Sequence, residues 1–152
     1  MASSFPDTFR AYVHESFSDN ALDVIKLRSG VTHEALAPGQ VRIKVHSAAV
    51  NPIDYGIVEL GLKLPFITSS PSGEDPFQMG YDAAGTLVEV GADVKSLQVG
   101  DEVYALAFHG SNKAFAEYVV LNAEYVSLKP KNMTFNEAAG APVVATTSYQ
   151  SL

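Results

Sequence analysis

The chain has 152 residues and a formal net charge of −7. This length predicts one domain with a sizeable core, since domains average roughly 100–200 residues. The acidic balance disfavours nucleic acids and anionic membranes as partners, because both attract clustered Lys and Arg. The sequence contains no cysteine, which excludes disulfides, thiol nucleophiles and cysteine-ligated metals.

The N-terminal residues lack the basic start and apolar run of a secretory signal. No stretch approaches the roughly 20 consecutive apolar residues that a membrane-spanning helix needs. We therefore expect a cytoplasmic protein that neither enters a membrane nor binds nucleic acid.

The first 50 residues predict β-strands separated by turns. Residues 10–17 and 22–28 form two strand candidates, with Ser18-Asp19-Asn20 as the turn between them. Residues 41–46 alternate most cleanly between apolar and polar side chains, as in a half-buried strand. The expected inner face holds Val41, Ile43 and Val45, and the expected outer face holds Arg42, Lys44 and His46.

Residues 51–78 are irregular, with four prolines and three glycines, and predict a short helix followed by a long loop. A loop of this length in a compact domain is usually functional or mobile. Further strands are expected at residues 83–90, 115–121 and 125–128, and within residues 99–104 Gly100-Asp101 indicates a turn that leads into another strand. Short strands with turns at this spacing indicate a mainly β protein, a barrel or a sandwich.

The pattern changes at Thr134, where Thr134-Phe135-Asn136-Glu137 fits a capping box that begins a short helix. Pro142 is suited to the first turn of a second helix, expected to run to Leu152. The sequence therefore divides into residues 1–133, a β domain, and residues 134–152, a helical segment that stops in mid-pattern. We expect this segment to be truncated.

Five segments in order resemble the N-terminal half of the medium-chain dehydrogenase/reductase superfamily. They are Val45-His46-Ser47-Ala48-Ala49-Val50-Asn51-Pro52-Ile53-Asp54, Gly80 to Gly91, Val99-Gly100-Asp101-Glu102-Val103-Tyr104, Phe115-Ala116-Glu117-Tyr118 and Ala138 to Gln150. The resemblance implies a GroES-like, partly open β-barrel with short helices. It also implies that the last helix leads to a nucleotide-binding Rossmann domain, which these 152 residues do not contain.

The residues that would ligate a catalytic zinc in this superfamily are replaced. Asn51 stands where zinc-dependent members have a cysteine, and Tyr81 stands where they have a histidine. Ile53 occupies the position of their hydroxyl proton relay. The four histidines are scattered and predict no tetrahedral ligand set. We therefore expect no zinc.

Within the superfamily the chain resembles the zinc-free branch that reduces quinones and activated C=C bonds of enones and alkenals. The resemblance implies NADPH as the cofactor and a small-molecule quinone or enone as the substrate. Hydride transfer builds negative charge on a carbonyl oxygen, so the site needs hydrogen-bond donors and a proton source. The implied catalytic residues are Asn51, Tyr55 and Tyr81; the implied cofactor-binding residues are Asn51, Val143 and Thr147.

Each of these residues also has a structural interpretation. Asn51 either donates to a substrate carbonyl or contacts the nicotinamide ribose, or it simply starts a turn. Tyr55 and Tyr81 either act on the substrate or fill space, and Thr147 either touches the nicotinamide or bonds back to its own helix. For the adjacent Asp82 we favour a structural role, fixing local backbone or pairing with a cation, and for Asp54 a helix cap.

The chain has no glycine-rich phosphate fingerprint after a strand. We therefore expect these 152 residues alone to be inactive as a reductase. The alternative is a stand-alone, non-enzymatic GroES-like interaction module that docks through Val143, Val144 and Leu152. Full-length members of the superfamily form homodimers mainly through the Rossmann domain, so this chain is expected to be monomeric or weakly associating.

Overall fold

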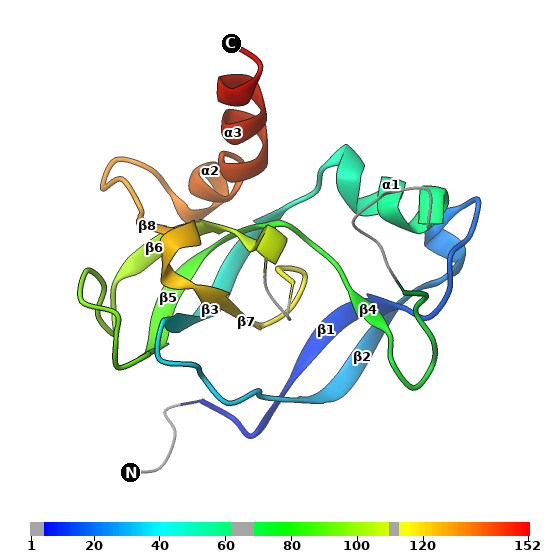
Figure 1. The fold of residues 1–152 in the computed structure, drawn as a ribbon, viewed down its shortest axis with the longest axis horizontal. Coiled ribbons are helices and arrows are strands. Elements are labelled where there is room, and N and C mark those ends of the chain that lie inside the picture. The colour runs from blue at the N-terminus through cyan, green and yellow to red at the C-terminus, as the bar shows by residue number, and fades with distance from the viewer. Residues whose placement is uncertain (1–4, 62–68, 110–112) are drawn as a thin grey trace.

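The computed structural model describes residues 5–61, 69–109 and 113–152, and it is built mainly from two antiparallel sheets (Figure 1). The smaller sheet has the strand order β2-β1-β4, with β1 at Thr8–His14, β2 at Ile25–Thr32 and β4 at Phe77–Gln78. The larger sheet has the order β7-β3-β5-β6-β8. Its strands are β3 (Gln40–Ala49), β5 (Asp82–Val90), β6 (Glu102–Leu106), β7 (Tyr118–Asn122) and β8 (Val126–Leu128). The sheets do not close into a full barrel, which confirms the mainly β, partly open architecture.

The larger sheet carries the principal hydrophobic core, which contains Val41, Ile43, Leu87, Val103 and Leu121. The inner face predicted for residues 41–46 is confirmed for Val41 and Ile43, both fully buried. The prediction that Arg42 lies on the outer face was wrong, because this residue is 2% exposed. The β3–β5 register shifts between Arg42 and Ile43, so strict alternation fails at this bulge.

The buried Arg42 guanidinium is fully engaged. Its Nε donates to Glu89 Oε2 at 2.9 Å, and its Nη2 donates to the Glu34 carbonyl at 2.7 Å. These hydrogen bonds compensate for the loss of hydration when the charged guanidinium is buried.

The predicted boundaries of three strands were wrong. β1 ends at His14, and residues Ala21–Asp23 form a 3-10 helix (η1) instead of beginning a strand. Asn20 starts η1, because its side chain accepts from the Leu22 amide at 3.3 Å. β2 therefore begins at Ile25, and β7 begins at Tyr118 rather than at residue 115.

The helices that follow residue 134 lie at the upper edge of the larger sheet, whereas the first helix lies on the side of the smaller sheet, next to η1 (Figure 1). The helices are α1 (Pro52–Leu60), α2 (Phe135–Ala139) and α3 (Pro142–Gln150), together with the short 3-10 helices η3 (Ala107–His109) and η4 (Ala123–Tyr125). The capping box predicted at Thr134 is confirmed, with Thr134 N donating to Glu137 Oε2 at 2.7 Å and Glu137 N donating to Thr134 Oγ1 at 3.3 Å. Within the described part of the chain, no helix is long and apolar enough to cross a membrane.

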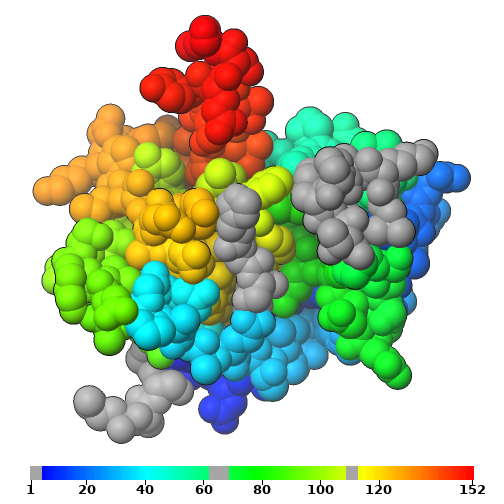
Figure 2. Space-filling view, viewed as in Figure 1, coloured from blue at the N-terminus to red at the C-terminus, as the bar shows by residue number. Residues whose placement is uncertain are grey.

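The last helix, α3, projects from the body of the molecule (Figure 2). Val144 is half-exposed, and Tyr149 and Leu152 lie largely in solvent. Most of the outer length of α3 is therefore not covered by the rest of this chain.

Candidate functional site

Asn51 and Asp82 lie close together because the end of β3 pairs with the start of β5. The β3–β5 register places Ala49 opposite Asp82, and Asn51 comes two residues after Ala49. Asn51 Nδ2 donates to Asp82 Oδ2 at 2.9 Å and to the Ala49 carbonyl at 3.4 Å. Because a carboxylate only accepts, this contact identifies which end of the Asn51 amide faces Asp82.

The Asn51 side chain is therefore oriented with its donor end turned into the protein. Asn51 is 6% exposed, and its side-chain oxygen faces the Asp54 backbone amide in the capping box that begins α1. The side-chain donor of Asn51 is consequently engaged within the protein and is not turned toward a substrate carbonyl.

Asp82 holds a second element as well. Its Oδ1 accepts from the backbone amide of Val143 at 2.8 Å, in the first turn of α3. The carboxyl is fully buried. Burial raises its pKa, and the hydrogen bonds from Asn51 and Val143 act in the opposite direction. The structural role expected for Asp82, fixing local backbone, is confirmed.

Asp54 caps α1 from its first turn, as predicted. Its Oδ2 accepts from the Asn51 amide at 2.6 Å, whereas its buried Oδ1 has no hydrogen-bond partner among the described residues. Burial raises the pKa of Asp54 to about 6, and the nearby charge of Asp82 adds to this effect. The Asn51 and Gly80 amides oppose it.

Asn51, Val143 and Thr147 line one open cavity of about 1020 Å³ between α3 and the larger sheet, which we call the α3 pocket. Ile53, Tyr104 and Phe108 also border it. Asn51 and Thr147 are distant in sequence, and the fold brings them to one cavity. All three residues implied for cofactor binding thus lie together.

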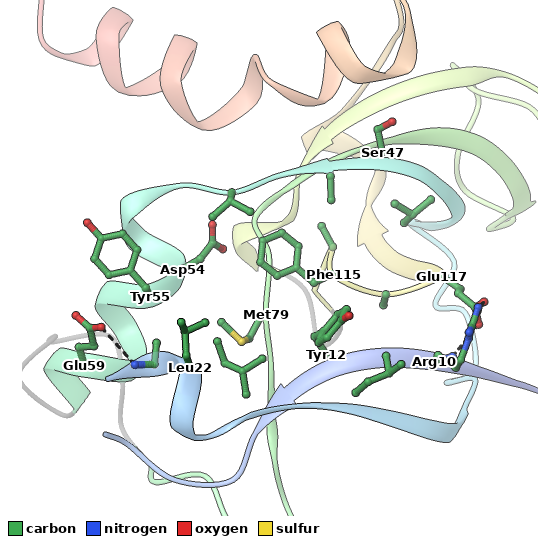
Figure 3. Close-up of a pocket in the computed structure, with 18 of the residues that line it drawn as sticks. Arg10, Tyr12, Leu22, Ser47, Asp54, Tyr55, Glu59, Met79, Phe115 and Glu117 are labelled. Atoms are coloured by element: carbon green, nitrogen blue, oxygen red, sulfur yellow. Dashed lines mark hydrogen bonds and ion pairs between the residues drawn. The ribbon is translucent and has the colours of Figure 1, made fainter. Parts of the chain in front are cut away.

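Tyr55 lies elsewhere, in a second cavity of about 950 Å³ between α1, β3 and the β1–β2 hairpin, which we call the hairpin pocket (Figure 3). Met79 and Phe115 line its interior, and Asp54 points toward it from α1. An ion pair between Arg10 Nη2 and Glu117 Oε1, at 2.6 Å, lies at one end of the pocket. The exposed apolar side chains that border this cavity are Tyr12, Leu22, Leu27, Val50 and Tyr55.

Tyr81 is buried and, among the described residues, borders neither cavity. Its ring packs at 5.2 Å from the ring of Phe108, which does line the α3 pocket. Burial and the charge of Asp54 raise the pKa of Tyr81 to about 12, so its phenol stays protonated.

Lys113, which the sequence analysis did not single out, lies over the Tyr81 ring, with Nζ 5.3 Å from the ring centroid. Its Nζ donates to the carbonyls of Ala107 and Phe108 at 3.1 and 2.9 Å. Burial lowers the pKa of Lys113 to about 8. The lysine thereby connects η3 to the segment before β7 that carries Phe115.

Among the residues that the structure describes, no group of three or more His, Asp or Glu side chains is arranged to hold a metal ion. The absence of zinc stays a prediction from the replaced ligands.

Comparison with known proteins assigns the family. Residues 37–131 match the model of the alcohol dehydrogenase GroES-like domain. The chain belongs to this family. It is 37% identical over 155 residues to the 2-methylene-furan-3-one reductase of tomato (Solanum lycopersicum), covering 98% of this chain and 38% of that protein. It is also 37% identical to the chloroplastic NADPH-dependent alkenal/one oxidoreductase of Arabidopsis thaliana, covering 99% of this chain and 38% of that protein.

Among solved structures, the quinone oxidoreductase from Coxiella burnetii matches with a TM-score of 0.79 at 28% identity, covering 95% of this chain and 44% of that one. The resemblance to the quinone and alkenal reductases of the medium-chain superfamily is confirmed. The chain spans 38% of the length of the two curated relatives named above.

Proposed function

We propose that this chain supplies the substrate-facing part of an NADPH-dependent reductase that acts on quinones or on the activated C=C bonds of enones and alkenals. The observation that supports this most is the convergence of Asn51, Val143 and Thr147 on the α3 pocket. The curated relatives include a reductase of a methylene-furanone and an NADPH-dependent alkenal/one oxidoreductase, which agree with such a substrate class.

The residues of the α3 pocket fit the nicotinamide end of the cofactor. Val143 offers an apolar surface for a flat ring, Thr147 a hydroxyl, and Asn51 an acceptor oxygen suited to a ribose hydroxyl or the ring carboxamide. A bound dihydronicotinamide supplies the hydride. The sequence has no glycine-rich turn to hold the phosphates, so this chain would bind only the nicotinamide end of the cofactor.

In the proposed reaction, hydride adds to the electrophilic carbon of the double bond, a proton adds to its neighbour, and negative charge develops on the carbonyl oxygen. Because the Asn51 donor is engaged by Asp82, Asn51 orients the cofactor rather than the carbonyl. Tyr55, 49% exposed on α1, lines the hairpin pocket and not the α3 pocket, so this arrangement supports no contact between its phenol and a carbonyl beside the nicotinamide. Tyr81 does not reach the α3 pocket itself, and its proposed role is to hold Phe108, which lines that pocket, in position.

The test is a chimera in which these 152 residues replace the matching part of the tomato relative. We expect NADPH oxidation that depends on an added enone or quinone, and none from the 152-residue chain alone. Asn51→Ala and Thr147→Val should each lower the rate or raise KM for NADPH, with the exposed Lys95→Ala as the matched control. A folded chimera without activity, or activity of the isolated chain, would contradict the proposal.

A second candidate function is the non-enzymatic interaction module, and the projecting α3 favours it. Among the described residues, Val144 is half-exposed and Tyr149 and Leu152 are largely exposed, and such apolar surface promotes association. Sedimentation distinguishes the two proposals. A defined complex with a protein that binds no nicotinamide nucleotide would support the module, and a monomer that regains activity in the chimera would support the reductase.

A further inference from the structure

The Asp82 carboxylate connects two residues that line the α3 pocket, Asn51 and Val143. Its two oxygens are used separately, one for the Asn51 side chain at 2.9 Å and one for the Val143 amide at 2.8 Å. Asn51 belongs to the start of α1, and Val143 belongs to the first turn of α3. One buried side chain on β5 thus contacts two helix beginnings that are far apart in sequence.

The surroundings of Asp82 are those of a side chain held in one conformation. It is 0% exposed, and its neighbours Ala83 and Ala84 are equally buried. Ala84 packs with Ala138 and Ala139 of α2, immediately before α3. A buried carboxylate is costly unless hydrogen bonds compensate it, and the two N–H donors, together with the positive end of the α3 dipole, do so.

We propose that Asp82 is a positioning residue that sets the geometry of the α3 pocket, by fixing the Asn51 amide and the first turn of α3 at once. The claim that this geometry presents the Asn51 oxygen and the α3 face to the nicotinamide rests on the proposed function. The positioning itself does not, because it follows from the contacts of this chain.

Asp82→Asn tests the assignment with minimal change in shape. An asparagine has one acceptor oxygen and one donor nitrogen in place of two acceptors. It can satisfy Asn51 or Val143 in the present arrangement, but not both, unless the Asn51 amide turns over. We therefore expect the Asn51 side-chain NH₂ signals or the Val143 amide signal to shift strongly in the ¹⁵N NMR spectrum of the 152-residue chain.

Asp101→Asn is the matched control. Asp101 Oδ2 accepts from the Gln98 amide at 2.9 Å in an exposed turn, so it is another single carboxylate that fixes backbone. This variant should leave the Asn51 and Val143 signals unchanged. Asp82→Ala provides a second test, because it removes both acceptors and should move both sets of signals.

Ligand affinity, measured in the folded protein, distinguishes a positioning role from a purely structural one, because a purely structural role would leave it unchanged. Reduced nicotinamide mononucleotide is the probe, titrated well below the unfolding temperature of each variant. We expect Asp82→Asn to weaken its binding by about five- to tenfold, as for the loss of one oriented hydrogen bond. Affinity unchanged from that of the unsubstituted chain, in a folded Asp82→Asn variant, would reduce Asp82 to a structural residue.

The two proposals fail in different ways. If the unsubstituted chain does not bind the mononucleotide, the proposed function is contradicted, and the NMR signals still decide whether Asp82 positions Asn51 and α3. If the Asn51 and Val143 signals are unchanged in both Asp82 variants, the positioning role is overturned even where the mononucleotide binds.

Discussion

The α3 pocket and the hairpin pocket differ in how their side chains are held in place. The α3 pocket is organised by directed hydrogen bonds around one buried carboxylate, Asp82. Both pockets are lined mostly by apolar side chains, but in the hairpin pocket the charged contact is an ion pair at one exposed end. Directed bonds fix the position of individual atoms, whereas apolar packing is tolerant of small displacements. We therefore place the proposed hydride chemistry, which needs a fixed orientation, at the α3 pocket.

The largest expected effect comes from removing the organising carboxylate. Asp82→Ala leaves the Asn51 amide group and the Val143 N–H without their acceptor, and we expect a loss of about 3 kcal/mol in the free energy of unfolding. Tyr55→Ala in the hairpin pocket, at a half-exposed position, should cost less than about 1 kcal/mol. Urea unfolding of both variants measures this, and equal losses would remove the distinction between the two pockets.

Gly80→Ala should have the next largest effect, because the backbone at Gly80 leaves no room for a side chain. Gly80 has φ +94°, which L side chains rarely adopt, and an added Cβ would meet the ring and amide of Phe115. We expect a loss of about 2 kcal/mol in the free energy of unfolding. Gly39→Ala is the control, since nothing lies within 4 Å of its added Cβ. A Gly80→Ala variant as stable as the control would show that the backbone there can relax.

Asp54 should make stability depend on pH. Its pKa of about 6 in the folded chain lies above the ordinary carboxyl value, so the folded state binds the extra proton and ionisation disfavours folding. Its contribution to stability is present below the ordinary pKa and is lost as pH rises through about 6. Asp54→Asn should therefore gain about 2 kcal/mol relative to the unsubstituted chain between pH 4 and pH 8.

The check on Asp54 is chemical denaturation of both proteins across that pH range. The difference between them isolates Asp54 from the other titrating groups. Parallel pH profiles would mean that the Asp54 carboxyl is not shifted, and that its unpartnered Oδ1 is solvated in solution.

The smallest effect is expected at the ion pair of the hairpin pocket. The Arg10 and Glu117 side chains are 60% and 42% exposed, and exposed ion pairs contribute little to stability. Arg10→Ala should change the unfolding midpoint only within measurement error, and less still at high salt. A clear, salt-sensitive loss of stability would show that this end of the hairpin pocket is also organised by charge.

Local features of the sequence were sufficient to predict part of this structure. The α2 capping box depends on Thr134 and Glu137, three residues apart, and it forms as expected. The mainly β architecture follows from alternation along single strands. The burial of Arg42 could not be predicted in this way, because it depends on a register shift between β3 and β5.

The candidate site shows the same limit. Asn51, Val143 and Thr147 were implied by the resemblance, but their meeting at one cavity depends on how α3 lies against the larger sheet. The orientation of Asn51 was not predictable, because it is set by Asp82, 31 positions away. One signal was present in the sequence: an acidic residue in a run of small residues at the start of a strand, where Asp is disfavoured.

The most direct test of the central claim is a ¹⁵N NMR titration of this chain with reduced nicotinamide mononucleotide. The account predicts that shifts concentrate at the Asn51 side chain, Val143 and Thr147, and leave Tyr55 and the β1–β2 hairpin unchanged. Shifts centred on the hairpin pocket, or no shifts at the three residues of the α3 pocket, would contradict it.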